Sequence, residues 1–218
     1  MTTTGENQVL AVFGATGKTG LALIAEARRR GWQVRALVRG AAKTLEGQVG
    51  VKIVRGEFSN LECVQETIAG ARAVCCVFGP HPPFTDVFCA DATRAVIAAM
   101  HCGGPHRLIV QTGAMVGHNL PNWTFAWRLM TSMYQRQQAN GARDRLEQER
   151  LVFESGSDWT IIKPPRLTDG AALGQVHAGS GERVGLLSRI SRADLVTWLM
   201  DEIEQPRFVG QVVFVVGR

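Results

Sequence analysis

The stretch Gly14-Ala15-Thr16-Gly17-Lys18-Thr19-Gly20 decides the fold of this chain. It directly follows an apolar run at residues 9–13 and opens a segment with helical spacing at residues 19–30. Glycines at this spacing allow a tight turn, close approach of the backbone to a pyrophosphate, and close packing of a helix on a strand. The free N–H groups of a helix N-terminus favour an anion. The residues expected to bind a dinucleotide are Gly14, Thr16, Gly17, Lys18, Thr19 and Gly20; the alternative is a tight turn without a ligand.

Two cations near this loop indicate which dinucleotide it binds. Lys18 would oppose the helix dipole unless an anion lies beside it, although a solvated lysine is the alternative. NAD sites usually carry an acidic residue at the end of the second strand, where this chain has Val38-Arg39-Gly40. Arg39 can pair with a 2′-phosphate. The expected cofactor is therefore NADP(H).

Apolar runs alternate with helical segments along the rest of the chain. The expected strands are residues 9–13, 33–38, 52–54, 73–77, 108–111, 159–162 and 211–216. Helices are expected to start at the capping box Ser59-Asn60-Leu61-Glu62 and at Ser191. This alternation is typical of right-handed βαβ units. The expected fold class is α/β, with a single-domain Rossmann-like, doubly wound parallel sheet over residues 1–218.

Composition excludes several other classes. The chain has 218 residues, of which 45% are hydrophobic, and a net charge of +5, which suits a folded globular protein rather than a disordered one. The mild charge argues against a nucleic-acid partner. The polar start and the polar residues within 108–127 argue against a signal peptide or a membrane span. Five cysteines without CxxC spacing predict no disulfide framework, no metal site and a reduced, cytoplasmic setting.

The chain resembles the atypical, short NAD(P)-binding members of the short-chain dehydrogenase/reductase superfamily. It is most similar to their biliverdin-IXβ reductase (flavin reductase) and NmrA-like branch. The resemblance lies in Val12-Phe13-Gly14-Ala15-Thr16-Gly17-Lys18-Thr19-Gly20, Leu37-Val38-Arg39, Val54-Arg55-Gly56-Glu57, and Glu154-Ser155-Gly156-Ser157-Asp158-Trp159-Thr160 leading into Lys163-Pro164-Pro165. It implies that further cofactor contacts come from Glu57, Phe58, Phe78, Gly79, Thr112, Pro164 and Pro165.

The chain departs from this superfamily in its acid/base residues. Standard members use a Ser and a Tyr-x-x-x-Lys pair, but the only tyrosine here is Tyr134, four residues before Gln138. Gly113 stands where related chains often carry Ser. Without this machinery, proton delivery is left to solvent, which favours a planar conjugated acceptor such as a flavin, a tetrapyrrole or a quinone-like ring. The remaining catalytic candidates are His118, Tyr134 and Arg145.

A segment at about 113–140 is expected to face the substrate. It is rich in aromatic residues and methionine, and we interpret Trp123, Trp127 and Met115 as a wall that stacks a flat acceptor. Two alternatives remain open, a helix with an apolar core face and a dimer contact. Charges alternate over residues 143–150, which indicates a solvated helix face with weak pairs. In a second interpretation, Arg145 faces the cleft and binds an anionic substrate.

The sequence thus predicts an NADPH-dependent reductase of a small planar molecule, monomeric or homodimeric. Two other classes stay open. One is an NADP(H)-binding redox sensor or regulatory module without chemistry, and the other is a biosynthetic enzyme that uses this scaffold for non-redox chemistry.

Overall fold

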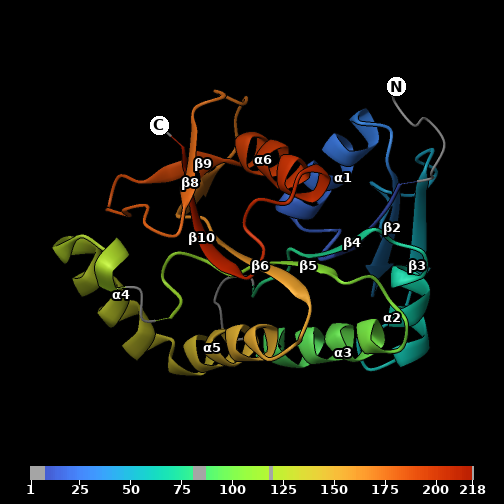
Figure 1. The fold of residues 1–218 in the computed structure, drawn as a ribbon, viewed down its shortest axis with the longest axis horizontal. Helices are drawn as coiled ribbons and strands as arrows, with labels where there is room; N and C mark the ends of the chain where they lie inside the picture. Colours follow the sequence, from blue (N-terminus) through green and yellow to red (C-terminus); the bar gives the residue numbers. More distant parts are fainter. Residues whose placement is uncertain (1–7, 81–86, 118–119, 218) are drawn as a thin grey trace.

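The computed structural model describes residues 8–80, 87–117 and 120–217, which form a sheet between two layers of helices (Figure 1). The strands are β1 (Val9–Phe13), β2 (Gln33–Val38), β3 (Val51–Arg55), β4 (Ala73–Cys76), β5 (Arg107–Gln111), β6 (Asp158–Lys163), β7 (Arg166–Thr168), β8 (Val176–Gly179), β9 (Arg189–Ser191) and β10 (Gln211–Gly217). The helices are α1 (Lys18–Arg29), α2 (Leu61–Ile68), α3 (Cys89–His101), the 3-10 helix η1 (Leu120–Asn122), α4 (Phe125–Gln137), α5 (Ala139–Phe153) and α6 (Arg192–Glu204).

The strand order is β3-β2-β1-β4-β5-β6-β10-β9-β7, with β8 also paired to β10. Every pairing from β3 across to β10 is parallel, which confirms the predicted doubly wound sheet. The strand order reverses between β1 and β4, and open α/β sheets bind ligands at such a switch point. At one edge the structure adds an antiparallel part to this sheet, because β8 and β9 run antiparallel to β10.

Strands β7, β8 and β9 have no counterpart among the predicted strands. They have only three or four residues each, and most of their residues are partly or fully exposed. Their side chains therefore lack the buried apolar run or the regular alternation by which a strand is found in a sequence. Pairing with β10 and with one another holds them in the sheet.

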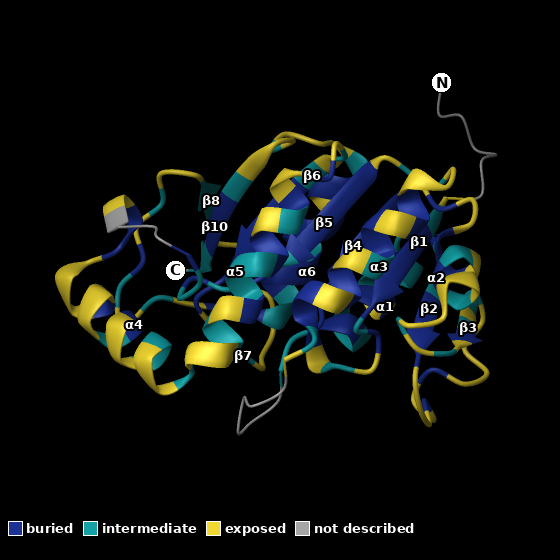
Figure 2. Ribbon diagram, turned by 90° about the horizontal axis from the view of Figure 1, so that it is seen from below, coloured by how far each residue is buried: buried dark blue, intermediate teal, exposed yellow. Residues whose placement is uncertain are grey.

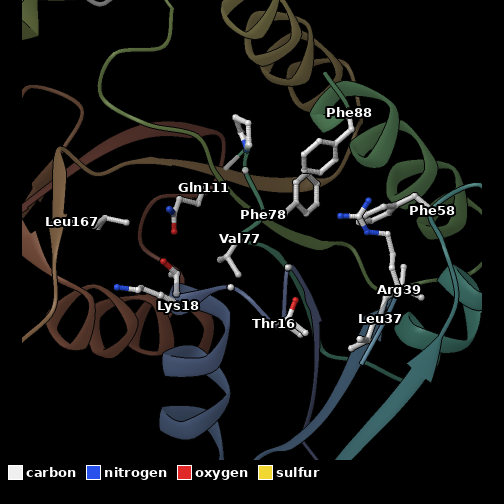
Figure 3. A pocket seen from close by; sticks show the side chains of 18 of the residues that line it. Thr16, Lys18, Leu37, Arg39, Phe58, Val77, Phe78, Phe88, Gln111 and Leu167 are labelled. Atoms are coloured by element: carbon white, nitrogen blue, oxygen red, sulfur yellow. The ribbon is translucent and has the colours of Figure 1, made fainter. Parts of the chain in front are cut away.

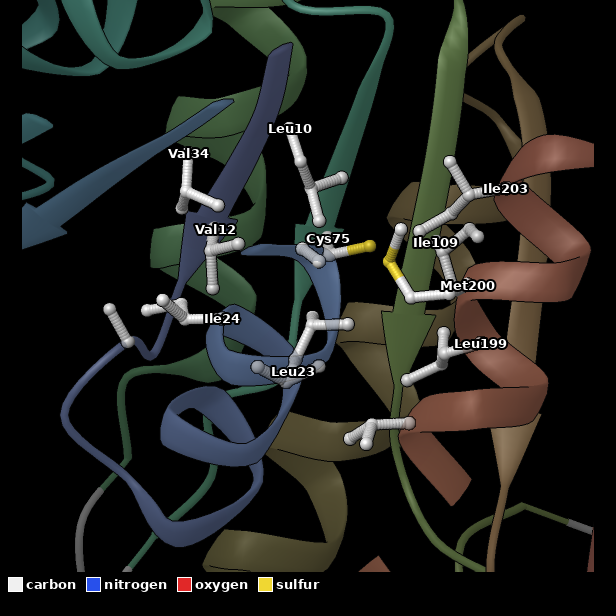
Figure 4. Packing of buried hydrophobic residues seen from close by; sticks show 14 of the residues in the cluster. Leu10, Val12, Leu23, Ile24, Val34, Cys75, Ile109, Leu199, Met200 and Ile203 are labelled. Carbon is white, nitrogen blue, oxygen red and sulfur yellow. The ribbon is translucent and has the colours of Figure 1, made fainter. Parts of the chain in front are cut away.

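Two apolar layers fix the helices on the sheet. On one face, α1 and α6 pack against the strands through side chains such as Leu23 and Leu199 (Figure 4). On the other face lie α2, α3 and α5. Cys75 belongs to the first layer and Cys76 to the second, as their adjacent positions on β4 require. Burial raises the pKa of Cys75 to about 12, so this thiol is a packing group.

Side-chain caps mark the starts of α2 and α6. Ser191 accepts a hydrogen bond from the backbone N–H of Asp194, so the predicted start of α6 is confirmed. The predicted capping box at α2 is shifted by one residue, because Asn60 is the cap and accepts from the N–H groups of Glu62 and Cys63. Asn caps helices as well as Ser does, so neighbouring Ser and Asn compete for this position.

Helix α4 lies at one end of the molecule, beyond α5, and is the most exposed of the helices (Figures 1 and 2). In the described part of the chain, no helix is long and apolar enough to cross a membrane.

Candidate functional site

A cavity of about 790 Å³ lies at the carboxyl ends of the strands, over the switch point between β1 and β4. It is lined by the β1–α1 loop, by residues at or after the ends of β2, β3, β4 and β5, by the residue before α3, and by side chains from α5, β7 and α6. The lining residues are Gly14, Ala15, Thr16, Gly17, Lys18, Thr19, Leu37, Val38, Arg39, Gly40, Ala41, Phe58, Val77, Phe78, Gly79, Pro80, Phe88, Gln111, Arg145, Leu167 and Arg192.

The glycines of the β1–α1 loop have different functions. Gly14 has φ +88°, and a Cβ there would lie 2.7 Å from the backbone nitrogen of Phe78. A Cβ on Gly20 would lie 2.2 Å from the carbonyl oxygen of Gly14. These two glycines therefore allow the loop to close against β4 and its own helix. Gly17 caps α1 with an ordinary φ of −74°, and its nearest neighbour for a Cβ is 3.4 Å away, so the fold itself tolerates a side chain there.

Aromatic rings and Arg39 form one side of the cavity. Figure 3 shows this group and, across the cavity, Lys18, Gln111 and Leu167. The rings of Phe58 and Phe78 meet edge to face with centroids 5.3 Å apart, and Phe78 and Phe88 are 5.8 Å apart. The Arg39 guanidinium lies 5.7 Å from the centroid of Phe88. A purine could stack against such a surface beside a cation. Phe88 was missed in the sequence, because nothing local distinguishes it from a core residue.

Lys18 has an anionic partner within the chain itself. Its ammonium donates to the Asp169 carboxylate at 2.7 Å, and Asp169 also pairs with Arg192 of α6. The hydrogen bond from Lys18, together with the charge of Arg192, lowers the pKa of Asp169. The side chains of Lys18 and Asp169 are exposed, and that of Arg192 is partly exposed. These ion pairs are therefore weak and exchangeable. Lys18 and Arg192 therefore stand at the cavity with a counter-ion that another anion can replace.

Arg145 reaches the cavity from α5 and bridges the ends of two strands. It donates to the carbonyls of Phe78 at 3.3 Å and Gln111 at 3.4 Å, and to the side chain of Gln148 at 2.7 Å. A Cβ on Gly79 would lie 2.4 Å from its Nη2. The predicted surface pairs of this helix are therefore wrong for Arg145, which faces the cleft as in the second interpretation.

A buried ionic network lies directly behind this wall. Lys163 donates to the Glu149 carboxylate at 2.9 Å and to the carbonyl of Val116 at 2.8 Å, and Thr112 donates to the same carboxylate at 2.8 Å. Burial lowers the pKa of Lys163, while the contact with Glu149 opposes that shift. Neither Lys163 nor Glu149 was among the expected site residues. The network joins β5, β6 and α5 at the cavity end of the sheet and fixes the position of Thr112.

Several predicted site residues do not line the cavity. Glu57 is exposed, Thr112, Pro164 and Pro165 are buried, Gly20 lies in α1, and Tyr134 lies on α4. His118 lies outside the described residues.

The predicted aromatic wall is part of a small core instead. Trp123 and Trp127 are 7% and 4% exposed and pack with Ala114, Val184 and Phe214, with Met115 at the margin. The Trp123 indole N–H donates to the carbonyl of Ala114 at 2.9 Å. These side chains do not reach the cavity, because they anchor α4 to the sheet. The alternative of a helix with an apolar core face describes Trp127 correctly, whereas Trp123 lies before α4 and forms an isolated bridge with Val184.

The cavity fits a dinucleotide in shape and charge. The β1–α1 loop is closed tightly by Gly14 and Gly20 yet leaves Gly17 open, and the α1 N-terminus faces the cavity. Four cations line it, and none of its described lining residues is acidic. Such a wall complements a ligand with several phosphates.

Known proteins resemble this chain over nearly its whole length. A family described as NAD(P)H-binding matches residues 14–206. The uncharacterized protein YwnB of Bacillus subtilis is 28% identical over 215 residues, which cover 95% of this chain and 98% of YwnB.

Two solved structures share the fold. ChuY, an anaerobilin reductase from Escherichia coli O157:H7, superimposes with a TM-score of 0.80 at 22% identity, over 96% of this chain and 97% of ChuY. A short-chain dehydrogenase/reductase from Veillonella parvula in complex with NADP gives a TM-score of 0.78 at 14% identity, over 97% and 94% of the two chains.

Proposed function

The chain belongs to the NAD(P)H-binding family, and from this premise we propose that it is an NADPH-dependent reductase of a planar conjugated acceptor. The observation that carries the proposal is the cavity itself. It joins the phosphate loop, an aromatic surface with Arg39, and a second polar end at Gln111 and Arg145. One end is suited to a dinucleotide and leaves the other for an acceptor.

Arg39 supports NADPH over NADH. It lines the cavity where β2 ends, and no described carboxylate pairs with it. A 2′-phosphate would give this guanidinium an ionic partner with matching fork geometry. An acidic residue, which would bind ribose hydroxyls, is not present among the described lining residues of that end.

The lack of a proton donor among the described lining residues supports a conjugated acceptor. No tyrosine, histidine or carboxylic acid occurs among the described residues that line the cavity. When bound, the cofactor supplies a hydride, and a proton from solvent completes a two-electron reduction of the acceptor. The chain's own residues then bind and orient the two partners, which is the main contribution needed for an electron-poor ring. The name of ChuY as an anaerobilin reductase supports an acceptor of this kind.

The test is consumption of NADPH by purified protein with a panel of FMN, riboflavin, biliverdin and a soluble quinone. We expect at least one acceptor to be reduced well above the rate without protein, and NADPH to be preferred over NADH. Arg143→Gln is the matched control, because Arg143 is exposed on α5 and does not line the cavity. Background consumption with every acceptor would refute the reductase.

The same lack of an acid in the described cavity wall favours a second candidate, an NADP(H)-binding sensor without turnover. Tight binding of NADPH together with background consumption in every assay would support it. Conversion of a substrate at the same rate when NADPH is omitted would instead support non-redox chemistry on this scaffold.

A further inference from the structure

Arg145 differs in its partners from two other cations of the cavity, Lys18 and Arg192. Lys18 and Arg192 share the carboxylate of Asp169. Arg145 contacts only neutral oxygens, and among the described residues no carboxylate lies within ion-pair distance of it. The side chain is half-buried, and a charge withdrawn from water without a counter-ion is unfavourable. A ligand anion would remove that cost.

The guanidinium also keeps donors free for such an anion. Of the five N–H donors of arginine, three make the hydrogen bonds described above, two from Nη1 and one from Nη2. The Nε–H and one N–H of Nη2 remain. Two donors on neighbouring nitrogens are what a carboxylate or phosphate accepts in a two-point contact. The three hydrogen bonds in place already restrict the group, so part of its side-chain freedom is lost before a ligand binds.

Gln111 adds a second unsatisfied group at the same place. Its carboxamide points into the cavity (Figure 3), and its Oε1 is buried without a hydrogen-bond partner among the described residues. A buried carbonyl oxygen without a donor is rare in a folded protein. Its backbone carbonyl is one of the anchors of Arg145, so the two side chains belong to one wall. A ligand N–H would satisfy this oxygen.

We propose that Arg145 and Gln111 form an acceptor subsite that selects an anionic, nitrogen-containing acceptor. This proposal rests on the proposed function. Arg145 binds a carboxylate or phosphate of the acceptor, and the Gln111 oxygen accepts a hydrogen bond from a ring N–H. In this proposal the phosphates of the dinucleotide bind elsewhere in the cavity. Their partners are the free N–H groups of the β1–α1 loop, Lys18 and Arg39. The subsite therefore distinguishes acceptors by charge and does not change the affinity of the protein for NADPH.

The experiment compares acceptors that share a chromophore and differ only in charge. FMN is paired with riboflavin, and biliverdin with its dimethyl ester. For the unmodified protein, we expect kcat/KM to be about tenfold to a hundredfold higher for the charged member of each pair, the range typical of a hydrogen bond to a charged group. Arg145→Gln should bring this ratio close to one, Arg145→Lys should retain part of it, and Arg143→Gln should leave it unchanged.

The role of Gln111 is tested by Gln111→Leu. This substitution should lower kcat/KM by the same factor for both members of an acceptor pair. An unchanged charge ratio in Arg145→Gln overturns the subsite. So does a loss of NADPH affinity in that variant with the ratio kept, because Arg145 would then serve the cofactor. If no acceptor is reduced, the proposed reductase activity is refuted. The subsite is then still tested by titrating the same acceptor pairs into NADP-loaded protein. Equal affinities for charged and neutral acceptors would refute it there.

Discussion

The guanidinium of Arg145 occupies the space that a side chain on Gly79 would need, since a Cβ there would lie 2.4 Å from Nη2. The absence of a side chain after β4 is therefore what admits a cation from α5 to the cavity wall. The resemblance to known reductases assigned Gly79 to the cofactor. The geometry adds a specific steric reason for glycine at this position.

We expect Gly79→Ala to displace Arg145 while the fold is kept, because the obstructed atom is the far end of a flexible side chain. The ratio of kcat/KM for FMN over riboflavin should fall about tenfold, as small displacements of a binding group can cost that much or more. Gly113→Ala is the control, since a Cβ there meets no atom within 4 Å. Equal ratios in the two variants would contradict the contact.

Gly17→Val should separate ligand binding from folding. The loop has room for a side chain at Gly17, and its φ of −74° suits valine, so the melting temperature should stay within about 3 °C. NADPH affinity should fall by about a hundredfold or more, since the side chain would stand where the pyrophosphate approaches. Gly14→Ala should instead lower the melting temperature, because that position has φ +88° and a close backbone neighbour. Full NADPH binding by Gly17→Val would show that the loop is not the phosphate site.

Arg39→Ala tests the choice of cofactor. Removing one partner of a charged hydrogen bond weakens NADPH binding by about tenfold to a hundredfold. NADH lacks the 2′-phosphate, so its dissociation constant should change much less. The two constants are measured by titration of wild type and variant at one ionic strength. Equal losses would refute a 2′-phosphate at Arg39.

The sequence predicts those parts of the site in which neighbouring residues alone determine the backbone conformation. The spacing of Gly14, Gly17 and Gly20 determines a turn, and Arg39 follows directly from the end of a predicted strand. The contacts of α5 could not be found in this way. Arg145 and Glu149 are spaced for a surface pair, yet their partners are the carbonyl of Phe78 and the ammonium of Lys163, which lie far away in the sequence. Tertiary contacts of this kind override helical spacing.

Trp123→Phe distinguishes a core residue from a substrate wall. The change removes the hydrogen bond from the indole N–H and leaves the buried carbonyl of Ala114 without that donor. The free energy of unfolding should fall by about 1–3 kcal/mol. The KM for the acceptor should stay within about twofold, because Trp123 does not line the cavity. Denaturant titration and steady-state kinetics check the two parts. A large rise in KM at unchanged stability would instead support the interpretation of Trp123 as part of a substrate wall.

Asp194 should make the stability of the protein sensitive to acid. Burial opposes its ionisation, but hydrogen bonds from Ser191 and from the backbone N–H groups of Leu173 and Gly174 outweigh burial and lower the pKa of Asp194 below 3.8. A carboxyl with a lowered pKa in the folded state stabilises the protein above its unfolded pKa, and this stabilisation is lost as pH falls through the folded pKa.

For Asp194→Asn we therefore expect a lower free energy of unfolding at pH 7, by about 1–3 kcal/mol. The difference from wild type should shrink below about pH 4, where the wild-type carboxyl takes up its proton. Urea titrations between pH 2.5 and pH 7 measure both curves. Parallel curves over this range would show that Asp194 does not contribute to the acid dependence.

Strand β10 lies inside the sheet although it follows all the other described strands in the sequence. It joins β6 to the antiparallel edge formed by β8 and β9. Until β10 has been made, β6 therefore presents an unpaired, apolar edge, and β8 and β9 lack the strand that they pair with in the finished sheet. Such edges invite association between nascent chains. This fold is consequently completed only once β10 has been made, and polypeptides that stop before β10 should be prone to aggregation.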